Sequence, residues 1–164
     1  MLEQALYHKP ETEYCYPISE NTIAMRLRAS KTDVLQVDVV YGGKYDFYEK
    51  RQRARMRLSY TDRLYNYFTA ELTLSDVRLV YVFELKEGDR ICYFSEDGLT
   101  EKYDYHFNFY NAFQFAYINA ADVHRQVEWM KNARFYQIFI DRFARGNFDK
   151  DDRYINLEWG TVPG

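Results

Sequence analysis

Residues 22–99 alternate between apolar and polar positions in short runs, and turn residues separate these runs. Such alternation places successive side chains on opposite faces of a β-strand. Strands are predicted over residues 22–28, 34–41, 57–60, 65–74, 78–85 and 91–94. Runs spaced by about ten residues with turns between them are typical of an antiparallel β-sandwich, and no long helical pattern interrupts them.

Glycine-containing turns support this interpretation. Gly42-Gly43 closes the second run, and Lys86-Glu87-Gly88-Asp89 connects the last two runs. Gly88 is available for the positive φ that a tight hairpin turn requires. We therefore expect the last two strands to form a hairpin.

The character of the chain changes after residue 122. Residues 123–132 are interpreted as a connector with Trp129 as its apolar anchor. Residues 133–140 form a nearly continuous apolar run that favours a strand covered on both faces, as in a parallel barrel. The charged remainder contains no predicted partner strand, which is the pattern expected of a truncated second domain.

Composition narrows the function classes. The chain has 164 residues and is 47% hydrophobic, enough for one core, and its net charge of −3 argues against binding to nucleic acid. No apolar run approaches the roughly 18 residues that a membrane span needs. The first residues show no secretory signal, and we expect a soluble, cytoplasmic protein with no membrane partner.

Residues 50–57 contain four alternating arginines, Arg51, Arg53, Arg55 and Arg57. On a strand they would share one face and could form a nucleic-acid stripe. The rest of the chain is acidic and adds no positive electrostatic potential that would attract a nucleic acid. A solvated loop or a sheet edge is therefore the preferred interpretation of residues 50–57.

Cys15 and Cys92 lie in aromatic-rich runs, where buried free thiols are expected. The three histidines share no metal-ligand spacing with them, which argues against a zinc site. Aromatic residues make up 19% of the chain, with 17 Tyr and 12 Phe. Most of these rings are expected to pack in the core and across strands, although Tyr also suits surfaces where flat ligands stack.

Five segments carry a family resemblance, and they read ALYHKP over residues 5–10, YCYP over 14–17, ENT leading into RLR over 20–28, FQFAYI over 113–118 and EWMKNARFYQIFIDRFA over 128–144. The last resembles the start of the catalytic barrel in glycoside hydrolases of the α-amylase family. The others resemble the N-terminal domain of the neopullulanase, cyclomaltodextrinase and maltogenic amylase branch. Ile140 departs from the proline that is usual there.

The resemblance implies an all-β, immunoglobulin-like antiparallel β-sandwich over residues 1–122. Residues 123–164 would be a linker and the first strand and loop of a truncated (β/α)8 TIM barrel. The family's catalytic carboxylates lie on later barrel strands. Asp141 matches a framework aspartate, so we predict no catalytic residues and no hydrolysis by this chain, whereas its full-length parent would be a glycoside hydrolase.

The resemblance also implies a site. In this branch the N-terminal domain often packs on a partner subunit and helps to close that subunit's active site. The matching segment here is residues 43–48, with Tyr45 as a stacking residue, Lys44 as a hydrogen-bonding cation and Tyr48 as an extension of the platform. Tyr65 and Tyr67 are further candidates for that platform, but packing along strands is the preferred interpretation for them and for Tyr48. For residues 43–48 as a whole, the alternative is an ordinary surface turn.

Relatives bind calcium in a loop that here covers residues 145–152. Asn147, Asp149 and Asp151 keep oxygen ligands of the type that calcium prefers, but Arg145 and Lys150 replace two amide positions. No cofactor is expected to be required, and calcium is a possibility for the full-length parent. The alternative is an acidic loop that holds no ion.

Two functions are carried forward. The first is a non-catalytic accessory domain of an α-glucan hydrolase that acts on cyclodextrins, pullulan or maltooligosaccharides. It would contact α-glucan oligosaccharides and help to form a homodimer in the parent enzyme. The second is a purely structural subunit-interaction module with no sugar binding of its own. Exposure of Tyr45 and its neighbours as a flat platform would favour the first.

Overall fold

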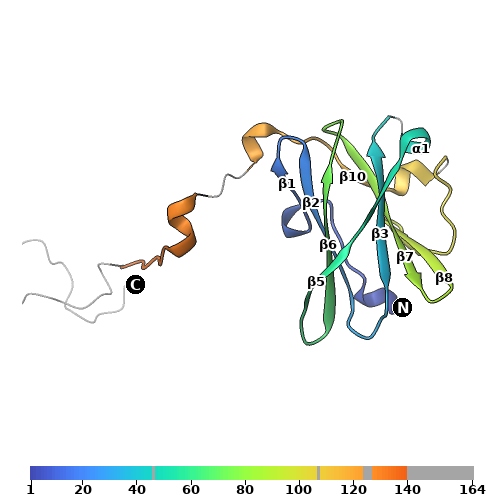
Figure 1. Cartoon of the computed structure of the whole chain (residues 1–164), viewed down its shortest axis with the longest axis horizontal. Coiled ribbons are helices and arrows are strands. Elements are labelled where there is room, and N and C mark those ends of the chain that lie inside the picture. The colour runs from blue at the N-terminus through green and yellow to red at the C-terminus, as the bar shows by residue number, and fades with distance from the viewer. Residues whose placement is uncertain (46, 107, 124–126, 140–164) are drawn as a thin grey trace, which may run out of the picture. The chain divides into compact units, whose positions relative to one another are not determined.

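The computed structural model describes residues 1–45, 47–106, 108–123 and 127–139, and the chain divides into two units, Met1–Arg125 and Gln126–Gly164. Within the described residues, the strands of the first unit form a four-stranded and a six-stranded sheet in which every pairing is antiparallel (Figure 1). The all-β, antiparallel sandwich predicted from the alternating pattern is confirmed.

The four-stranded sheet has the order β1 (Cys15–Ser19), β2 (Thr22–Ser30), β6 (Tyr65–Thr73) and β5 (Arg57–Thr61). The six-stranded sheet has the order β4 (Gln52–Arg55), β3 (Gln36–Gly43), β7 (Leu79–Glu87), β8 (Arg90–Ser95) and β9 (Gly98–Thr100), and β10 (Phe113–Phe115) also pairs with β7. The helical segments are short: α1 (Phe47–Lys50) and the 3₁₀ turns η1 (Glu3–Ala5), η2 (Thr12–Tyr14), η3 (Asn108–Asn111), η4 (Ala120–Asp122) and η5 (Glu128–Asn132).

The main core lies between the sheets. In β2 the alternation is regular, because Ile23, Met25, Leu27 and Ala29 are buried and the residues between them are partly exposed. Their side chains join one cluster with residues of β3, β6 and β7 from both sheets. A face-to-face arrangement of this kind is what an alternating strand with one polar face requires.

Strand β7 departs from alternation, because Leu79, Val80, Tyr81, Val82 and Phe83 are all buried. The outer face of this strand is covered by a second, smaller cluster. Its members are Val40, Phe47, Val80, Val82 and Ala112, with Tyr103 and Tyr105 packed against them. A central strand that is covered on both faces therefore reads as a continuous apolar run although its sheet is antiparallel.

The chain passes from one sheet to the other at Met56 without an intervening loop. β4 ends at Arg55 in the six-stranded sheet, and β5 begins at Arg57 in the four-stranded sheet. The Met56 N–H donates to the carbonyl oxygen of Val37 at 2.9 Å, and the Met56 side chain is buried in the main core. One residue therefore fixes the crossover by both its backbone and its side chain.

The arginines of residues 50–57 are split by this crossover and do not form one stripe. Arg53 and Arg55 lie on the edge strand β4, which confirms the sheet-edge interpretation. Arg55 Nε donates to Asp38 Oδ1 at 2.5 Å, and Arg53 pairs with Glu84. Neighbouring carboxylates thus neutralise the two arginines of β4, and Arg57 lies in the other sheet.

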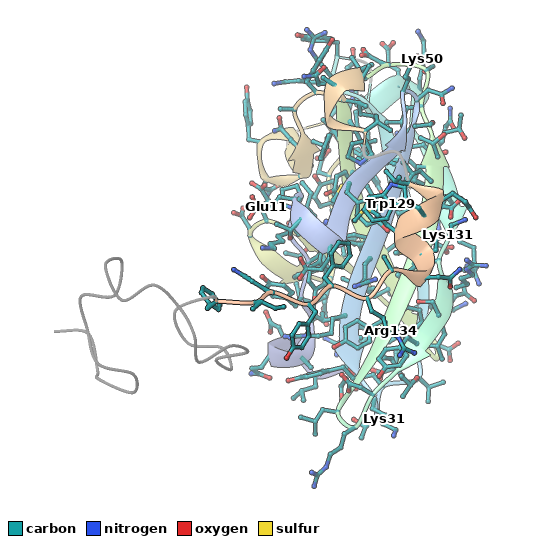
Figure 2. The ribbon with its side chains drawn as sticks, turned by 90° about the vertical axis from the view of Figure 1, so that its left-hand side faces the viewer. Glu11, Lys31, Lys50, Trp129, Lys131 and Arg134 are labelled. Carbon is teal, nitrogen blue, oxygen red and sulfur yellow. The ribbon has the colours of Figure 1, made fainter. Side chains whose placement is uncertain are left out.

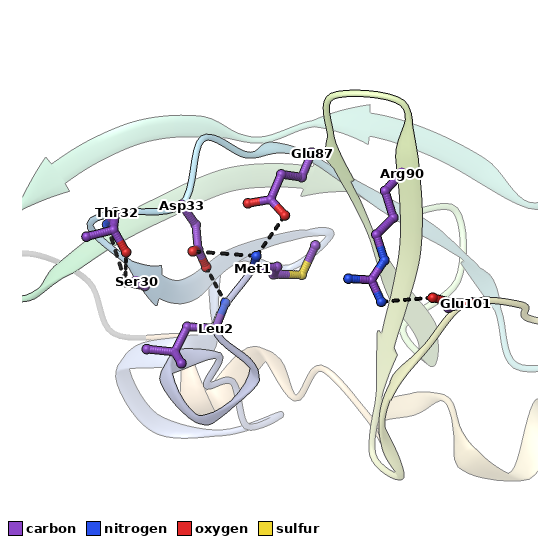
Figure 3. Close-up of polar contacts among 8 residues, drawn as sticks. All are labelled: Met1, Leu2, Ser30, Thr32, Asp33, Glu87, Arg90 and Glu101. Atoms are coloured by element: carbon purple, nitrogen blue, oxygen red, sulfur yellow. Dashed lines mark hydrogen bonds and ion pairs between the residues drawn. The ribbon is translucent and has the colours of Figure 1, made fainter.

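The first residues are held at the end of the sandwich that carries the β7–β8 hairpin (Figure 3). The ammonium nitrogen of Met1 lies 2.7 Å from Oε2 of Glu87 and 3.8 Å from Oδ1 of Asp33. The Leu2 N–H donates to Oδ2 of Asp33 at 2.8 Å. The predicted glycine turn of this hairpin is confirmed, since Gly88 has a φ of +60°.

The second unit contains η5, in which Lys131 Nζ lies 2.6 Å from Glu128 Oε2. The strand predicted over residues 133–140 is wrong for its described part, because residues 133–139 form no strand. A strand needs hydrogen bonds to a neighbouring strand, and no described segment pairs with these residues. Trp129, the predicted apolar anchor of this connector, is 65% exposed, and its ring contacts Phe135 at a centroid distance of 6.1 Å.

Candidate functional site

The candidate site lies on the connection between β3 and β4, where the short helix α1 follows the end of β3 (Figure 1). Phe47 anchors this connection, since only 1% of its surface is exposed and it belongs to the smaller cluster. A Cβ at Gly42 would lie 3.2 Å from Cδ2 of Phe47, which is tighter than an ordinary contact. Gly42 therefore allows the Phe47 ring to pack directly against β3.

Tyr45 points away from the core and is 74% exposed. The guanidinium carbon of Arg78 lies 5.8 Å from the centroid of its ring, on the segment that leads into β7. This distance is within the range of a cation–π contact, although exposed contacts of this kind are weak. Lys44, beside it, is partly exposed. The structure therefore places the predicted stacking residue on a surface that a ligand can reach.

Tyr48 has a different neighbour. It is 43% exposed, and its ring lies 4.7 Å from the ring of His106 at an interplanar angle of 33°. Its carbonyl oxygen accepts a hydrogen bond of 2.6 Å from Arg51 Nη1. Tyr45 thus lies before α1 and Tyr48 within it, and the two rings contact different segments, Arg78 and His106, instead of forming one flat platform.

Tyr65 and Tyr67 do not extend this surface, because both lie in strand β6, as the preferred interpretation of strand packing predicted. Tyr65 pairs with Ser30 in β2, beside Lys31, and Tyr67 pairs with Arg28. Figure 2 shows Lys31 and Lys50 at opposite ends of the sandwich, with Lys50 at the end that carries α1. The pairing of β2 with β6 places Tyr65 at the far end, and this pairing could not be read from the sequence alone.

Sequence reasoning did not identify the residues that complete the surroundings of Tyr48. An open hollow of about 440 Å³ is lined by Tyr48, Arg51, Lys102, Tyr103, Asp104, Tyr105 and His106. The Arg51 guanidinium carbon lies 4.4 Å from the centroid of the Tyr105 ring. The only indication in the sequence was the high frequency of aromatic residues after residue 102. This frequency does not reveal which end of the strands those aromatic residues lie against.

The tyrosines of this hollow are uncharged over the physiological pH range. Burial raises the pKa of Tyr105 to about 12, and it raises the pKa of Tyr103 further. Their phenol groups therefore serve as neutral rings and hydrogen-bonding groups, not as bases.

Cys15 and Cys92 are buried free thiols, as predicted. Burial raises the pKa of the Cys15 thiol to about 12, so this group is a poor nucleophile. Among the described residues, no three His, Cys, Asp or Glu side chains are grouped closely enough to hold a metal ion. The predicted calcium ligands Asn147, Asp149 and Asp151, together with Asp141, lie outside the described residues.

The helices within the described part of the chain are all too short or too polar to cross a membrane.

Comparison with known proteins identifies a family for most of the chain. Residues 1–119 match the family described as "Alpha amylase, N-terminal ig-like domain". The maltogenic alpha-amylase of Bacillus acidopullulyticus is 33% identical over 165 aligned residues, which cover 98% of this chain and 28% of the relative. Neopullulanase 2 of Thermoactinomyces vulgaris is 37% identical over 154 residues, covering 92% of this chain and 26% of the relative.

A solved structure of a cyclomaltodextrinase superposes with a TM-score of 0.75 at 31% sequence identity, over 92% of this chain and 26% of that chain. The chain thus spans little more than a quarter of the length of the relatives that it matches.

Proposed function

The chain belongs to the family of N-terminal immunoglobulin-like domains of alpha amylases, and from this we propose that it is the accessory domain of an α-glucan hydrolase. The names of its relatives support this substrate class, because they include a cyclomaltodextrinase and a neopullulanase. We propose that the parent acts on cyclodextrins, pullulan or maltooligosaccharides and that this part of it does not perform the hydrolysis.

Within residues 43–48, the proposed contact with sugar is made by Tyr45 as its centre and by Lys44 beside it. The observation that carries this proposal is the exposure of Tyr45, 74%, on a connection that the buried Phe47 holds in place. An exposed ring can stack on the C–H face of a sugar, and little ordering entropy is lost when its support is already rigid. Lys44 supplies a cation that can donate hydrogen bonds to hydroxyl groups.

A second candidate function is a subunit-interaction module, and one surface favours it. The outer face of the four-stranded sheet is rich in Tyr and Arg, and these residues come from β2, β5 and β6 and from the segment before η2: Tyr7, Arg26, Arg28, Arg57, Tyr60, Tyr65 and Tyr67. Tyr and Arg are enriched at the centres of protein interfaces. We propose that such a face would join subunits of the parent enzyme in a homodimer.

Calorimetric or NMR titration of the 164-residue chain with β-cyclodextrin and with maltoheptaose tests the proposed sugar contact. Saturable binding that is weakened in Tyr45→Ala is the expected result, with an affinity on the order of millimolar because little ligand area is desolvated. Tyr60→Ala is the matched control, since Tyr60 is 62% exposed on the other sheet. If neither sugar binds at several millimolar, the interaction module becomes the preferred function, and sedimentation analysis of the chain then tests self-association.

A further inference from the structure

We propose that the hollow beside Tyr48 is a second α-glucan contact surface, separate from Tyr45, with Tyr48, Arg51 and His106 as its principal residues. This inference rests on the proposed function for the substrate class. Its location and composition come from the geometry of the described residues alone.

The aromatic floor of the hollow is held in place from below. The ring of Tyr105 meets the ring of the buried Phe47 edge to face, with centroids 5.8 Å apart and an interplanar angle of 63°. Tyr103 contacts Tyr105 at 5.0 Å in a similar geometry. Both tyrosines pack against the smaller core cluster, so the floor is continuous with the folded interior. A site of this kind requires little rearrangement before a ligand binds.

The partly exposed ring of Tyr48 is fixed in its orientation. His106 covers part of this ring at 4.7 Å, and Arg51 binds the Tyr48 carbonyl oxygen. Arg51 is itself placed over Tyr105, where its planar guanidinium group faces the same hollow. A stacking ring thus stands beside a group with several hydrogen-bond donors in fixed directions.

The charges around the hollow are of both signs. Arg51 and Lys102 supply cations, while Asp104 supplies a carboxylate, whose Oδ1 accepts a hydrogen bond of 2.9 Å from the backbone N–H of His106. An anionic ligand would meet the carboxylate, and a cationic ligand would meet the two cations. A neutral ligand whose hydroxyl groups both donate and accept hydrogen bonds suits this mixture, and its C–H faces would suit the rings.

The volume of the hollow, about 440 Å³, lies within the range of roughly 300–1,000 Å³ that is usual for ligand sites. Because the hollow is shallow and widely open to solvent, a chain of sugar units can lie across it without being enclosed. These properties point to a segment of an oligosaccharide in preference to a compact small molecule.

Histidine NMR of the 164-residue chain provides a direct test, because the chain has only three histidines and His106→Gln identifies the signal of His106. Titration with maltoheptaose should shift the His106 ring signal in a saturable manner and leave that of the buried His8 unchanged. The shift should persist in Tyr45→Ala. The affinity reported by the ring signal should fall about threefold to tenfold in Tyr48→Ala, with the melting temperature as the control for folding.

Other outcomes separate this inference from the proposed function. If sugar binds and Tyr45→Ala abolishes every change, including that of His106, the second surface does not exist and the proposed function stands. If sugar binds without any change at His106, the inference is again wrong while the proposed function stands. If cellohexaose moves the His106 signal as strongly as maltoheptaose, the assignment to α-glucans is wrong. An absence of binding to either surface would overturn both.

Discussion

Nε2 of His8 lies 2.8 Å from the hydroxyl oxygen of Tyr81, and Nδ1 of the same ring lies 2.7 Å from the carbonyl oxygen of Arg26. A carbonyl oxygen only accepts, so Nδ1 carries the proton and Nε2 accepts from the Tyr81 hydroxyl. The rings of Phe83 and Phe113 lie within 5 Å of the imidazole. The core is therefore built around a neutral histidine.

This arrangement predicts a loss of stability in mild acid. Burial lowers the pKa of His8 from 6.5 to about 4, so between these values the unfolded chain binds a proton that the folded chain does not. The contribution of His8 to the free energy of unfolding should be constant above the unfolded pKa and should fall by about 3 kcal/mol in total as the pH drops from 6.5 to 4. Urea unfolding at several pH values measures this fall.

His8→Gln provides the comparison for this prediction, because glutamine keeps a donor and an acceptor but does not titrate. Its free energy of unfolding should be lower at neutral pH and should depend less on pH than that of the unchanged chain. Parallel pH profiles for the two proteins would show that His8 is not responsible.

Arg55→Ala should destabilise the six-stranded sheet. Asp38 is 5% exposed, and the substitution removes the guanidinium group that hydrogen-bonds its carboxylate. We expect a loss of about 1–2 kcal/mol, because a nearly buried carboxylate loses a charged partner while Arg53 remains within 4 Å. Arg57→Ala is the control, since no carboxylate of a described residue forms an ion pair with Arg57. An equal loss of unfolding free energy in the two variants would contradict a stabilising role for the contact between Arg55 and Asp38.

Arg28 is expected to stabilise the outer face of the four-stranded sheet through two rings. Its guanidinium carbon lies 4.9 Å from the centroid of Tyr7 and 4.3 Å from that of Tyr65. Arg28→Met keeps an apolar side chain but removes the cation, and it should lower the free energy of unfolding by about 1 kcal/mol. Thermal unfolding of Arg28→Met beside Arg26→Met, on the same face of β2, measures the difference. The prediction fails if the two variants unfold alike.

The ammonium group of Met1 should make stability sensitive to alkaline pH. Its pKa is raised from 8.0, chiefly by the hydrogen bond to Glu87, and folding therefore favours the protonated form. This stabilisation is fully present below pH 8 and is lost as the pH rises through the raised pKa. Melting temperatures between pH 7 and 10 should decline more steeply for the unchanged chain than for Glu87→Gln. The same slope in both would contradict a role for this contact.

The sequence predicted the fold class and the strands whose side chains alternate. It was less informative where packing is decided by distant segments. Phe113 to Phe115 were not recognised as a strand, because three residues hardly establish a period, and their pairing with Leu79 to Tyr81 depends on tertiary structure. The apolar run at residues 133–139 led to the opposite error, since a pattern that favours a strand does not supply a partner for it.

The residues of the candidate site could likewise be predicted from the sequence only in part. Tyr45 could be chosen in advance because the resemblance to the α-amylase branch implies a contact at residues 43–48. The partners Arg78 and His106 could not, because each stands more than thirty positions away and reaches the loop only through strand pairing. The register of β2 with β6 places Tyr65 in a strand pair away from Tyr48, in agreement with the strand packing that was the preferred interpretation for it.

The crossover at Met56 also determines where the chain can tolerate an inserted residue. An inserted residue between Gln52 and Leu58 would reverse the side-chain alternation of β4 relative to β3, or of the start of β5 relative to β6, with no loop to absorb it. The turn at Gly88 and Asp89 connects two strands of the same sheet, so an insertion there is not constrained by the register of two sheets at once. Lineages of this domain should therefore vary in length at their hairpins, and new chain ends for circular permutation should be tolerated there and rejected at Met56.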